Sequence, residues 1–357
     1  MPQPNITTPE QALLQLRAGN STPEAKLKAA SFLILQNHFA HYREVIEVLR
    51  PLESHFSENV EWLYCVGYAL VTKHEPAASI PYLLRSIRYI QNNAALYTAL
   101  TWAYLQVDDF GNAFLTSSAG LHNCAEKGTL PSLQYLSRVR FEGHRVVAFP
   151  KQGIDFKYAL FTSNTQEIEA ALHHLTQQFT EQDELEMLRE HLGQVNSIAE
   201  VGCLVGNHSV YFLHTFRPQR MKIMDASRVS LEHARENLEL NLTDSSPLEV
   251  DYVHTAIGRE SGTLRFFDEQ VPVNSLSNLL TEPFDFLKID VDGMEMEALE
   301  GAESYLLEHQ PRVMIEVLHD YKSTFEAFLQ RVRYHIVSRI ERPHYSNYLI
   351  APESRKS

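Results

Sequence analysis

The stretch FLKIDVDGMEMEALEGA, residues 286–302, concentrates acidic residues at the point where an apolar run stops. Four acids follow that run: Asp290, Asp292, Glu295 and Glu297. Two carboxylates as close as those of Asp290 and Asp292 do not ionise together easily, so one of them is expected to have a raised pKa that suits proton transfer. We therefore predict Asp290 and Asp292 as catalytic residues, and Glu295 as a third member that binds substrate.

Two other residues of this stretch have structural interpretations. Lys288 lies inside the apolar run, and we expect it to form an internal ion pair with a neighbouring acid. Glu297 falls in the first turn of the helix that follows, where negative charge interacts favourably with the helix dipole. We expect both residues to support the site rather than to react.

The strand expected at RVMIEVL, residues 312–318, adds two candidates. Glu316 lies near its end and is predicted to bind a substrate hydroxyl, with plain structural support as the alternative. His319 follows the strand and is a second candidate catalytic base, because the intrinsic pKa of histidine suits proton transfer near neutral pH. A solvated loop histidine is the competing interpretation.

A second constellation, EVGCLVGN at residues 200–207, ends the first strand of an expected open sheet, where ligands bind beyond the carboxyl ends of the strands. Gly202 lets the chain turn sharply, and Gly206 keeps the next turn open to a ligand. The spacing E-x-G-x-x-x-G differs from the G-x-G-x-x-G of dinucleotide sites, which place a pyrophosphate at a helix N-terminus. The acid Glu200 suits a cationic ligand better, such as the sulfonium S-adenosylmethionine.

Asp225 ends the next expected strand after the glycine loop, where its carboxylate can accept both hydroxyls of a ribose. NAD sites share such an acid, so its position after the glycine loop, rather than its presence alone, favours S-adenosylmethionine as the cofactor. The residues predicted to bind this cofactor are Glu200, Gly202, Cys203, Gly206, Asp225, Ala226 and Asp290.

Metal binding is not expected from the histidines. The 17 histidines form no ligand set, and His38 and His41 lie close together on an expected helix without a third partner at a fitting spacing. We therefore predict no resident metal. A divalent ion at the acids of residues 290–297, aiding deprotonation of the acceptor, stays open as an alternative.

The elements that position these residues alternate between strands and helices from about residue 197 onward. Near-continuous apolar strands between helices predict a mostly parallel sheet covered on both faces. The last two strands, YHIVSRI and SNYLIAP, are separated only by ERPHY, which is too short for a crossover helix and predicts antiparallel neighbours. This is the architecture of class I methyltransferases: a Rossmann-like, seven-stranded α/β sheet with an antiparallel C-terminal hairpin. One helix is expected over MEMEALEGAESYLLEH, residues 294–309.

The first part of the chain, residues 1–144, is expected to be an all-α domain, followed by an α/β domain over 145–357. Apolar and small residues of segment 59–92 recur in segment 93–124, with Leu63 matching Tyr97 and Val66 matching Leu100. The two segments are offset by 34 residues (93 − 59). This matches the period of about 34 residues of the tetratricopeptide repeat, whose arrays bind protein partners. An ordinary helical bundle is the alternative, and the helix expected around residues 131–141 closes the array.

Composition bounds the partners. The chain has 31 basic and 45 acidic residues, a formal net charge of −14 that argues against nucleic acid, because phosphate binding needs a basic face. No apolar run is long enough for a membrane span, and the segment 1–20 lacks the regions of a signal peptide. Three widely spaced cysteines are typical of reduced thiols, so we expect a cytoplasmic protein.

The motifs FLKIDVDGMEMEALEGA, EVGCLVGNHSVYFL, ENLELN, HTAIGRESGTLRFF and SNYLIAP resemble the FkbM family of methyltransferases over about residues 145–351. The resemblance implies S-adenosylmethionine-dependent O-methylation of a hydroxyl on a sugar, glycan or natural-product-like acceptor. It places Glu200, Gly202 and Gly206 at the methionine end of the cofactor, Asp225 at the ribose, and Asp290 where the strand opens into the active site.

The chain departs from the family pattern at three places. Glu200 stands where aspartate is usual, and Asp292 stands where glutamate is usual. The segment MDAS, residues 224–227, replaces the usual acid-and-proline turn, which leaves the adenosine contacts less defined.

Other functions stay open at this point. The helical region is expected to recruit a protein or a glycosylation enzyme, with a cover over the site or a homodimer contact as alternatives. The whole chain could instead be a protein-binding repeat module fused to a methyltransferase fold that serves as a scaffold without turnover. An aminopropyl transferase on the same fold is a third alternative.

Overall fold

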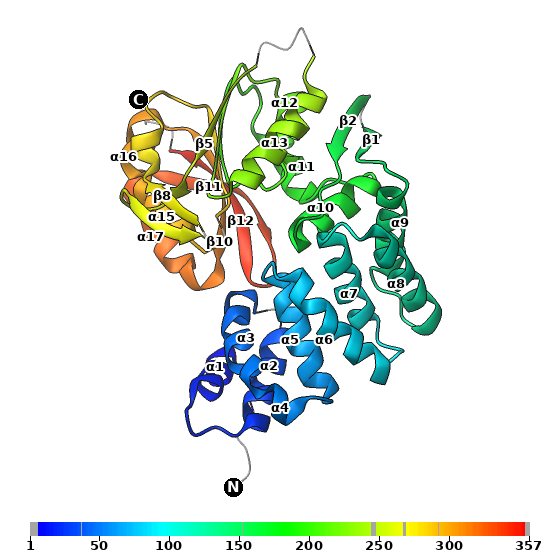
Figure 1. The fold of residues 1–357 in the computed structure, drawn as a ribbon. Coiled ribbons are helices and arrows are strands. Elements are labelled where there is room, and N and C mark those ends of the chain that lie inside the picture. Colours follow the sequence, from blue (N-terminus) through cyan, green and yellow to red (C-terminus); the bar gives the residue numbers. More distant parts are fainter. Residues whose placement is uncertain are drawn as a thin grey trace. The chain divides into compact units, whose positions relative to one another are not determined.

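The computed structural model describes residues 6–36, 38–151, 153–243, 248–266, 269–291 and 293–353 (Figure 1). The chain divides into two compact units: residues 1–146 with 160–175, and residues 147–159 with 176–357. Each unit has its own hydrophobic core. None of the helices within the described residues is long and apolar enough to cross a membrane.

The first unit is helical. Its α-helices are α1 (Pro9–Arg17), α2 (Pro23–Leu35), α3 (Tyr42–Leu49), α4 (Glu53–Phe56), α5 (Val60–Thr72), α6 (Pro76–Tyr89), α7 (Ala94–Gln106), α8 (Phe110–Asn123), α9 (Leu130–Phe141) and α10 (Thr165–Leu175). The pair α5 and α6 recurs as α7 and α8, with both ends of each helix shifted by one constant offset along the chain (Figure 1). The helix expected around residues 131–141 is present as α9, whereas α10 was not predicted.

Matching caps and small residues explain this recurrence. Asn59 and Asn93 cap α5 and α7, since the side chain of each accepts hydrogen bonds from backbone N–H groups of the first turn. At Gly120 the helices approach so closely that an added Cβ would lie 2.8 Å from the Cβ of Tyr97. The helical hairpin of α5 and α6 therefore recurs as α7 and α8, and the assignment to tetratricopeptide-type repeats stays a prediction.

The second unit is built on a seven-stranded sheet of order β11-β12-β10-β9-β3-β4-β5. These strands are β3 (Ser197–Val201), β4 (Arg220–Asp225), β5 (Glu249–His254), β9 (Phe286–Ile289), β10 (Arg312–Leu318), β11 (Tyr334–Glu341) and β12 (Tyr345–Pro352). Strand β12 is antiparallel to both β10 and β11, and the other pairs are parallel. The predicted fold class is confirmed: an all-helical region precedes a mostly parallel, Rossmann-like seven-stranded sheet with an antiparallel C-terminal hairpin, as expected for the class I methyltransferase fold.

Helices cover both faces of this sheet (Figure 1). On one face the core includes side chains of α11 (Gln182–His191), α12 (Asn207–Thr215) and α13 (Arg228–Asn241). On the other face it includes α15 (Glu295–Gly301), α16 (Glu303–His309) and α17 (Lys322–Val332). Alternation along β9 divides its residues between the faces: Phe286 belongs to the first core, and Leu287 and Ile289 to the second.

Smaller elements complete the second unit. Strands β1 (Val146–Lys151) and β2 (Ile154–Ala159) form a hairpin, and β6 (Ala256–Ile257), β7 (Gly262–Phe266) and β8 (Glu269–Asn274) form a three-stranded sheet. A short helix, α14 (Leu276–Leu279), follows β8. The sequence analysis did not predict β8, because Pro272 within the run argues against a strand.

The prediction of a single helix over residues 294–309 was wrong. The segment forms α15 and α16, which are separated at Ala302. A Cβ added at Gly301 would lie 2.2 Å from the carbonyl oxygen of Gly258. The end of α15 at Gly301 therefore packs directly against the backbone of Gly258, with no room for a side chain.

Candidate active site

The residues predicted to bind the cofactor lie at the carboxyl ends of three adjacent strands, β3, β4 and β9. Strand β3 lies between β9 and β4, so the segments that follow these strands are neighbours. Glu200 on β3 and Lys288 on β9 are direct cross-strand partners. By alternation both side chains lie on the face that carries α11 and α12.

Lys288 is the centre of this arrangement. Its Nζ lies 3.0 Å from Oδ2 of Asp290 and 3.9 Å from Oε1 of Glu200, and it donates to the carbonyl oxygen of Gly202 at 2.8 Å. Burial lowers the pKa of Lys288, but the carboxylates of Asp290, Glu200 and Glu181 outweigh that effect, so the net pKa is raised. The predicted internal ion pair is confirmed, and the ammonium group is charged.

Glu200 is fully buried beneath the glycine loop. Its Oε2 accepts a hydrogen bond from the hydroxyl of Ser209 on α12, at 2.5 Å. Burial raises the pKa of Glu200 to about 7, although Lys288 and Ser209 act in the opposite direction. Glu200 therefore connects β3 to the first turn of α12, and it exchanges a proton near neutral pH.

The two loop glycines are required by close contacts of the backbone. Gly202 has φ +77°, and an added Cβ would lie 1.8 Å from the carbonyl oxygen of Asp290. Gly206 has φ +72°, and an added Cβ would lie 2.7 Å from Cα of Ala234 on α13. The loop thus packs directly against the segment after β9 and against α13, and both positions exclude a side chain.

Asp225, at the end of β4, fixes the same loop from the other side. Its Oδ2 accepts from the backbone N–H of Cys203 at 2.9 Å, and its Oδ1 accepts from that of Ser227 at 2.8 Å. Ala226 is held by its carbonyl oxygen, 2.9 Å from Nε2 of His254 at the end of β5. Burial raises the pKa of the Cys203 thiol well above its usual range, so this cysteine is neutral.

The acids after β9 separate into different environments. The side chain of Asp290 is 32% exposed, so it combines its contact with Lys288 with access to a ligand. Asp292 lies outside the described residues, and the expected sharing of a proton between Asp290 and Asp292 stays a prediction. Glu295 is 1% exposed, and its Oε1 accepts from the backbone N–H of Gly293 at 2.7 Å. Glu297 is exposed in the first turn of α15, as expected.

The candidates on β10 lie two strands from β3, next to β12. Glu316 is half-buried and pairs in register with Asn347. His319 is exposed, with its Nε2 3.4 Å from Oγ of Ser346. Burial, followed by Glu316 and other acids, raises the pKa of Tyr345 to about 12. Of the two candidates, Glu316 is therefore less exposed than His319.

Three residues of the site were missed by the sequence analysis: Ser209, Glu181 and His208. Glu181 immediately precedes α11 with φ +55°, and His208 lies in the first turn of α12. Nε2 of His208 is 3.2 Å from Oε2 of Glu181. The sequence did contain one indication of these residues: His208 and Ser209 directly follow the glycine loop. At that place the start of a helix lies next to the strand ends. We call Glu181, Glu200, His208, Lys288 and Asp290 the charge cluster.

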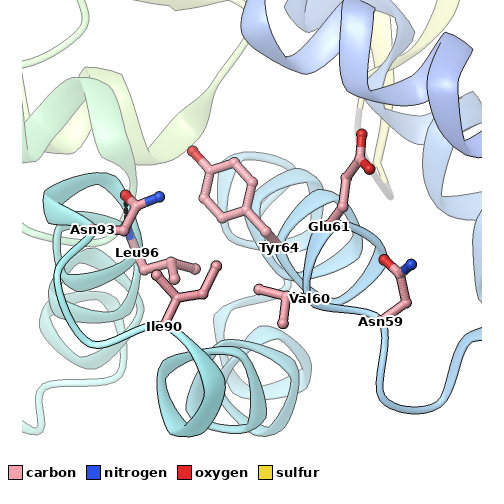
Figure 2. A pocket seen from close by; sticks show the side chains of 7 residues that line it. All are labelled: Asn59, Val60, Glu61, Tyr64, Ile90, Asn93 and Leu96. Atoms are coloured by element: carbon pink, nitrogen blue, oxygen red, sulfur yellow. Dashed lines mark hydrogen bonds between the residues drawn. The ribbon is translucent and has the colours of Figure 1, made fainter.

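A hollow of about 380 Å³ lies in the other unit, at the start of α5 and α7 (Figure 2). It is lined by Asn59, Val60, Glu61, Tyr64, Ile90, Asn93 and Leu96. None of these residues belongs to the charge cluster, so the hollow is a feature of the helical unit. Across the part of the chain that the structure describes, no group of three or more His, Cys, Asp or Glu is placed to hold a metal ion.

Several solved structures with some similarity to this chain are methyltransferases. The methyltransferase FkbM from Methylobacillus flagellatus KT is 15% identical, with a TM-score of 0.37 over 74% of this chain and 65% of that chain. The ribosomal protein L11 methylase from Lactobacillus delbrueckii subsp. bulgaricus is 17% identical, with a TM-score of 0.35 over 48% of this chain and 78% of that chain. The TrmK of M. capricolum, in complex with S-adenosyl-homocysteine, is 17% identical, with a TM-score of 0.34 over 48% of this chain and 68% of that chain.

No curated protein matches the chain. Residues 204–338, which run from the glycine loop into β11, match the family model of the methyltransferase FkbM domain. This segment contains Asp225, Lys288 and Asp290, and the strand order around it is the one described above. Within the second unit, residues 204–338 are therefore similar to the methyltransferase FkbM domain.

Proposed function

We propose that this domain transfers a methyl group from S-adenosylmethionine to a hydroxyl of a sugar, glycan or natural-product-like acceptor. The observation that carries the proposal is the meeting of a glycine loop, a ribose-type acid and a partly exposed acid at three adjacent strand ends. These are Gly202, Asp225 and Asp290. Ligands of open α/β sheets bind at this edge.

The residues present fit the cofactor. Oδ1 of Asp225 accepts one backbone N–H, which leaves a lone pair for a ribose hydroxyl, and Oδ2 accepts the N–H of Cys203 and, at 3.4 Å, its weak S–H donor, which a second hydroxyl would replace. The carboxylate of Asp290 offers negative charge to an ammonium or sulfonium group. When bound, S-adenosylmethionine supplies an electrophilic methyl group. We propose that Gly202, Cys203, Gly206 and Ala226 contribute backbone to the same site.

The burial of Glu200 favours a supporting role. With no exposed surface it does not reach a ligand directly, so the cofactor contact expected from sequence is replaced by a proposal that it acts through Ser209 and Lys288. It holds the start of α12, and it balances the charge of Lys288. In this way the loop between β3 and α12 keeps one shape.

The acceptor side is proposed from the remaining candidates. Asp290 stays a candidate for accepting the proton of the hydroxyl, with Lys288 orienting its carboxylate. Asp292 and His319 are retained as further candidates for this role. Glu316 is proposed to bind substrate, since it is half-buried beside β12. Glu295 already accepts the N–H of Gly293, which favours support of the turn over substrate binding.

For the helical unit we propose tetratricopeptide-type repeats that recruit a protein partner. The recurrence of α5 and α6 as α7 and α8 at one constant offset supports the repeat, and the hollow between the starts of α5 and α7 offers apolar side chains beside Glu61 (Figure 2). A homodimer contact is the alternative. The three cysteines are buried and unpaired, which supports a reducing, cytoplasmic location.

Calorimetry with S-adenosylmethionine tests the cofactor proposal. The wild-type chain is expected to bind saturably, and Asp225→Ala to bind at least about tenfold more weakly, because two hydroxyls lose a charged acceptor. Asp251→Ala, an exposed acid on β5, is the matched control and binds as the wild type does. Absence of heat with folded wild-type protein contradicts the proposal.

Turnover separates the enzyme from the scaffold alternative. A methyl-labelled donor is offered with glycan and small-molecule extracts, and transfer of label is followed for the full chain and for Asp225→Ala. Label that depends on Asp225 supports O-methylation once the product is identified. Cofactor binding without transfer to any acceptor supports the scaffold alternative.

A further inference from the structure

Glu181 and His208 form a close pair that no motif of the sequence marks. Glu181 lies just before α11, and His208 lies on the next helix, just after the glycine loop. Oε2 of Glu181 is 3.2 Å from Nε2 of His208. The side chain of Glu181 is 30% exposed and that of His208 is 5% exposed, so the histidine is the more deeply buried of the two.

The backbone holds Glu181 in place by contacts that cross between the two helix starts. The side chain of Asn207 donates to the carbonyl oxygen of Thr180 at 3.0 Å, and Tyr158 donates to the carbonyl oxygen of Asn207 at 3.1 Å. Glu181 itself has a left-handed backbone, which costs a non-glycine residue on the order of 1 kcal/mol. These contacts retain that conformation and aim the side chain of Glu181 at His208.

The protonation of His208 is set by its surroundings. Burial, together with the charge of Lys288, lowers the pKa of His208 well below its ordinary value, so the ring is neutral. One ring N–H is committed to the backbone of Thr180. Nε2 of His208 makes no hydrogen bond within the described residues. A neutral imidazole has one donor and one acceptor nitrogen, so Nε2 is the acceptor when the other ring nitrogen carries the proton. An acceptor nitrogen facing a carboxylate oxygen is repulsive until a proton lies between them.

We propose that Glu181 accepts the proton of the acceptor hydroxyl, and that His208 is the positioning residue that stabilises the proton once it has arrived. The proposal rests on the proposed function and names its base. As the acceptor oxygen bonds to the methyl carbon, its O–H proton passes to Glu181, and the sulfur of the donor keeps the electron pair of the broken C–S bond. The protonated carboxyl then donates to Nε2 of His208, so the repulsive pair becomes a hydrogen bond.

The charges around the pair tune it to neutral pH. Burial raises the pKa of Glu181 to about 7, with further increases from Asp290 and Glu184 and opposite effects from Lys288 and Arg342. Among these groups, Glu184 is fully buried and bonded to Arg342 and Asn347. Asp290 already accepts a hydrogen bond from Lys288. Glu181 is thus a partly exposed acid of the charge cluster, and once protonated it can donate to Nε2 of His208.

Titration by NMR tests the pair on the full chain without any ligand. Carboxyl and imidazole nitrogen signals are followed from about pH 4 to 9 in the wild type, in Glu181→Gln and in His208→Gln. We expect Glu181 to titrate near pH 7 and His208 to be neutral at that pH, with a pKa well below its ordinary value. His208→Gln is expected to lower the pKa of Glu181 by about one unit, a tenfold change in proton affinity.

Matched controls lie on the same helices. Glu190→Gln on α11 is exposed, and His214→Gln on α12 removes a ring whose partner is Asn241 rather than Glu181. Both controls leave the titration of Glu181 unchanged. A pKa of Glu181 near 4.5 in the wild type, or one that His208→Gln does not move, overturns the proposal.

Calorimetry links the pair to the cofactor. A cationic ligand placed beside Glu181 lowers its pKa, so binding of S-adenosylmethionine at pH 7 should release protons from the wild type and none from Glu181→Gln, measured in buffers of different ionisation enthalpy. Equal proton release from both proteins contradicts the inference. If the NMR result holds but S-adenosylmethionine does not bind, the proposed function fails while the proton-sharing pair stands.

Discussion

The two units of this chain bury polar groups in different ways. In the helical unit the fully buried polar side chains include Ser79, Thr101 and Ser117, and each hydroxyl donates to a carbonyl of its own helix. In the sheet unit, the charge cluster buries Glu200 and Lys288, whose partners come from other elements. Neutral hydroxyls bonded within their own helix cost little to bury, whereas charges need partners supplied by the fold.

The two ways of burying polar groups have different consequences for stability and for pH dependence. Hydroxyls such as those of Ser79, Thr101 and Ser117 are satisfied within their own helices, so their burial needs no partner from another element. The charge cluster retains groups that exchange protons near neutral pH, and it depends on contacts among β3, β9, α11 and α12. We therefore expect substitutions in the cluster to have larger and more pH-dependent effects than equivalent substitutions in the helical unit.

The largest effect is expected from Lys288→Met. Removing the ammonium leaves Glu200 and Asp290 without their shared cation, and breaking a buried ion pair in this way costs about 3–5 kcal/mol of unfolding free energy at pH 8. Denaturant unfolding measures it. The control Lys222→Met, which removes the partner of exposed Asp251, costs less than about 1 kcal/mol. Equal effects from the two substitutions contradict the comparison.

The second expected effect is a change in pH dependence. The pKa of Glu200 is raised from 4.5 to about 7, so the folded state binds this proton more tightly than the unfolded state does. Its contribution to stability is therefore complete below pH 4.5 and is lost as the pH rises through 7. Glu200→Gln lacks this loss and should gain up to about 3 kcal/mol relative to the wild type between pH 4.5 and 8.

Chemical unfolding of the wild type and Glu200→Gln across this pH range measures the gain. Glu249→Gln, at an exposed acid on β5, serves as the control and should parallel the wild type. A constant difference between Glu200→Gln and the wild type at all pH values would show that the buried carboxyl is not titrating in this window.

The smallest expected effect compares two serines. Ser79 on α6 and Ser209 on α12 are both fully buried, but Ser79 bonds to the carbonyl of Pro76 and Ser209 to the carboxyl of Glu200. Ser209→Ala should cost about 2 kcal/mol at pH 8, because a buried carboxylate loses its donor, and Ser79→Ala less than about 1 kcal/mol. Thermal unfolding compares them directly, and a greater loss from Ser79→Ala would reverse the interpretation.

The sequence analysis succeeded where the cause is local. The helical character of α5 to α8 follows from the spacing of apolar residues, and the caps at Asn59 and Asn93 agree with it. The short connection ERPHY was sufficient to predict that β11 and β12 are antiparallel. The ion pair of Lys288 was predictable, because a lysine inside an apolar strand requires an acid nearby.

The sequence analysis failed where the structure depends on a contact between residues far apart in the chain. The break at Ala302 reflects the packing of Gly301 against Gly258, which the helical pattern of residues 294–309 does not contain. Glu295 was expected to bind substrate, yet it is buried and accepts the N–H of Gly293. The pair of Glu181 and His208 was missed because the two residues belong to different helix starts and share no motif.

By itself, the sequence indicated the seven strands of the main sheet, the glycines of the loop after β3, and the resemblance to FkbM methyltransferases. These depend on periodicity and backbone conformation within a short stretch of chain. Only the tertiary structure decided which acids meet, which of them are buried, and which face a histidine or a lysine. The physical reason is that a proton affinity depends on burial and on neighbouring charges, and at this site the neighbours come from β3, β9, α11 and α12.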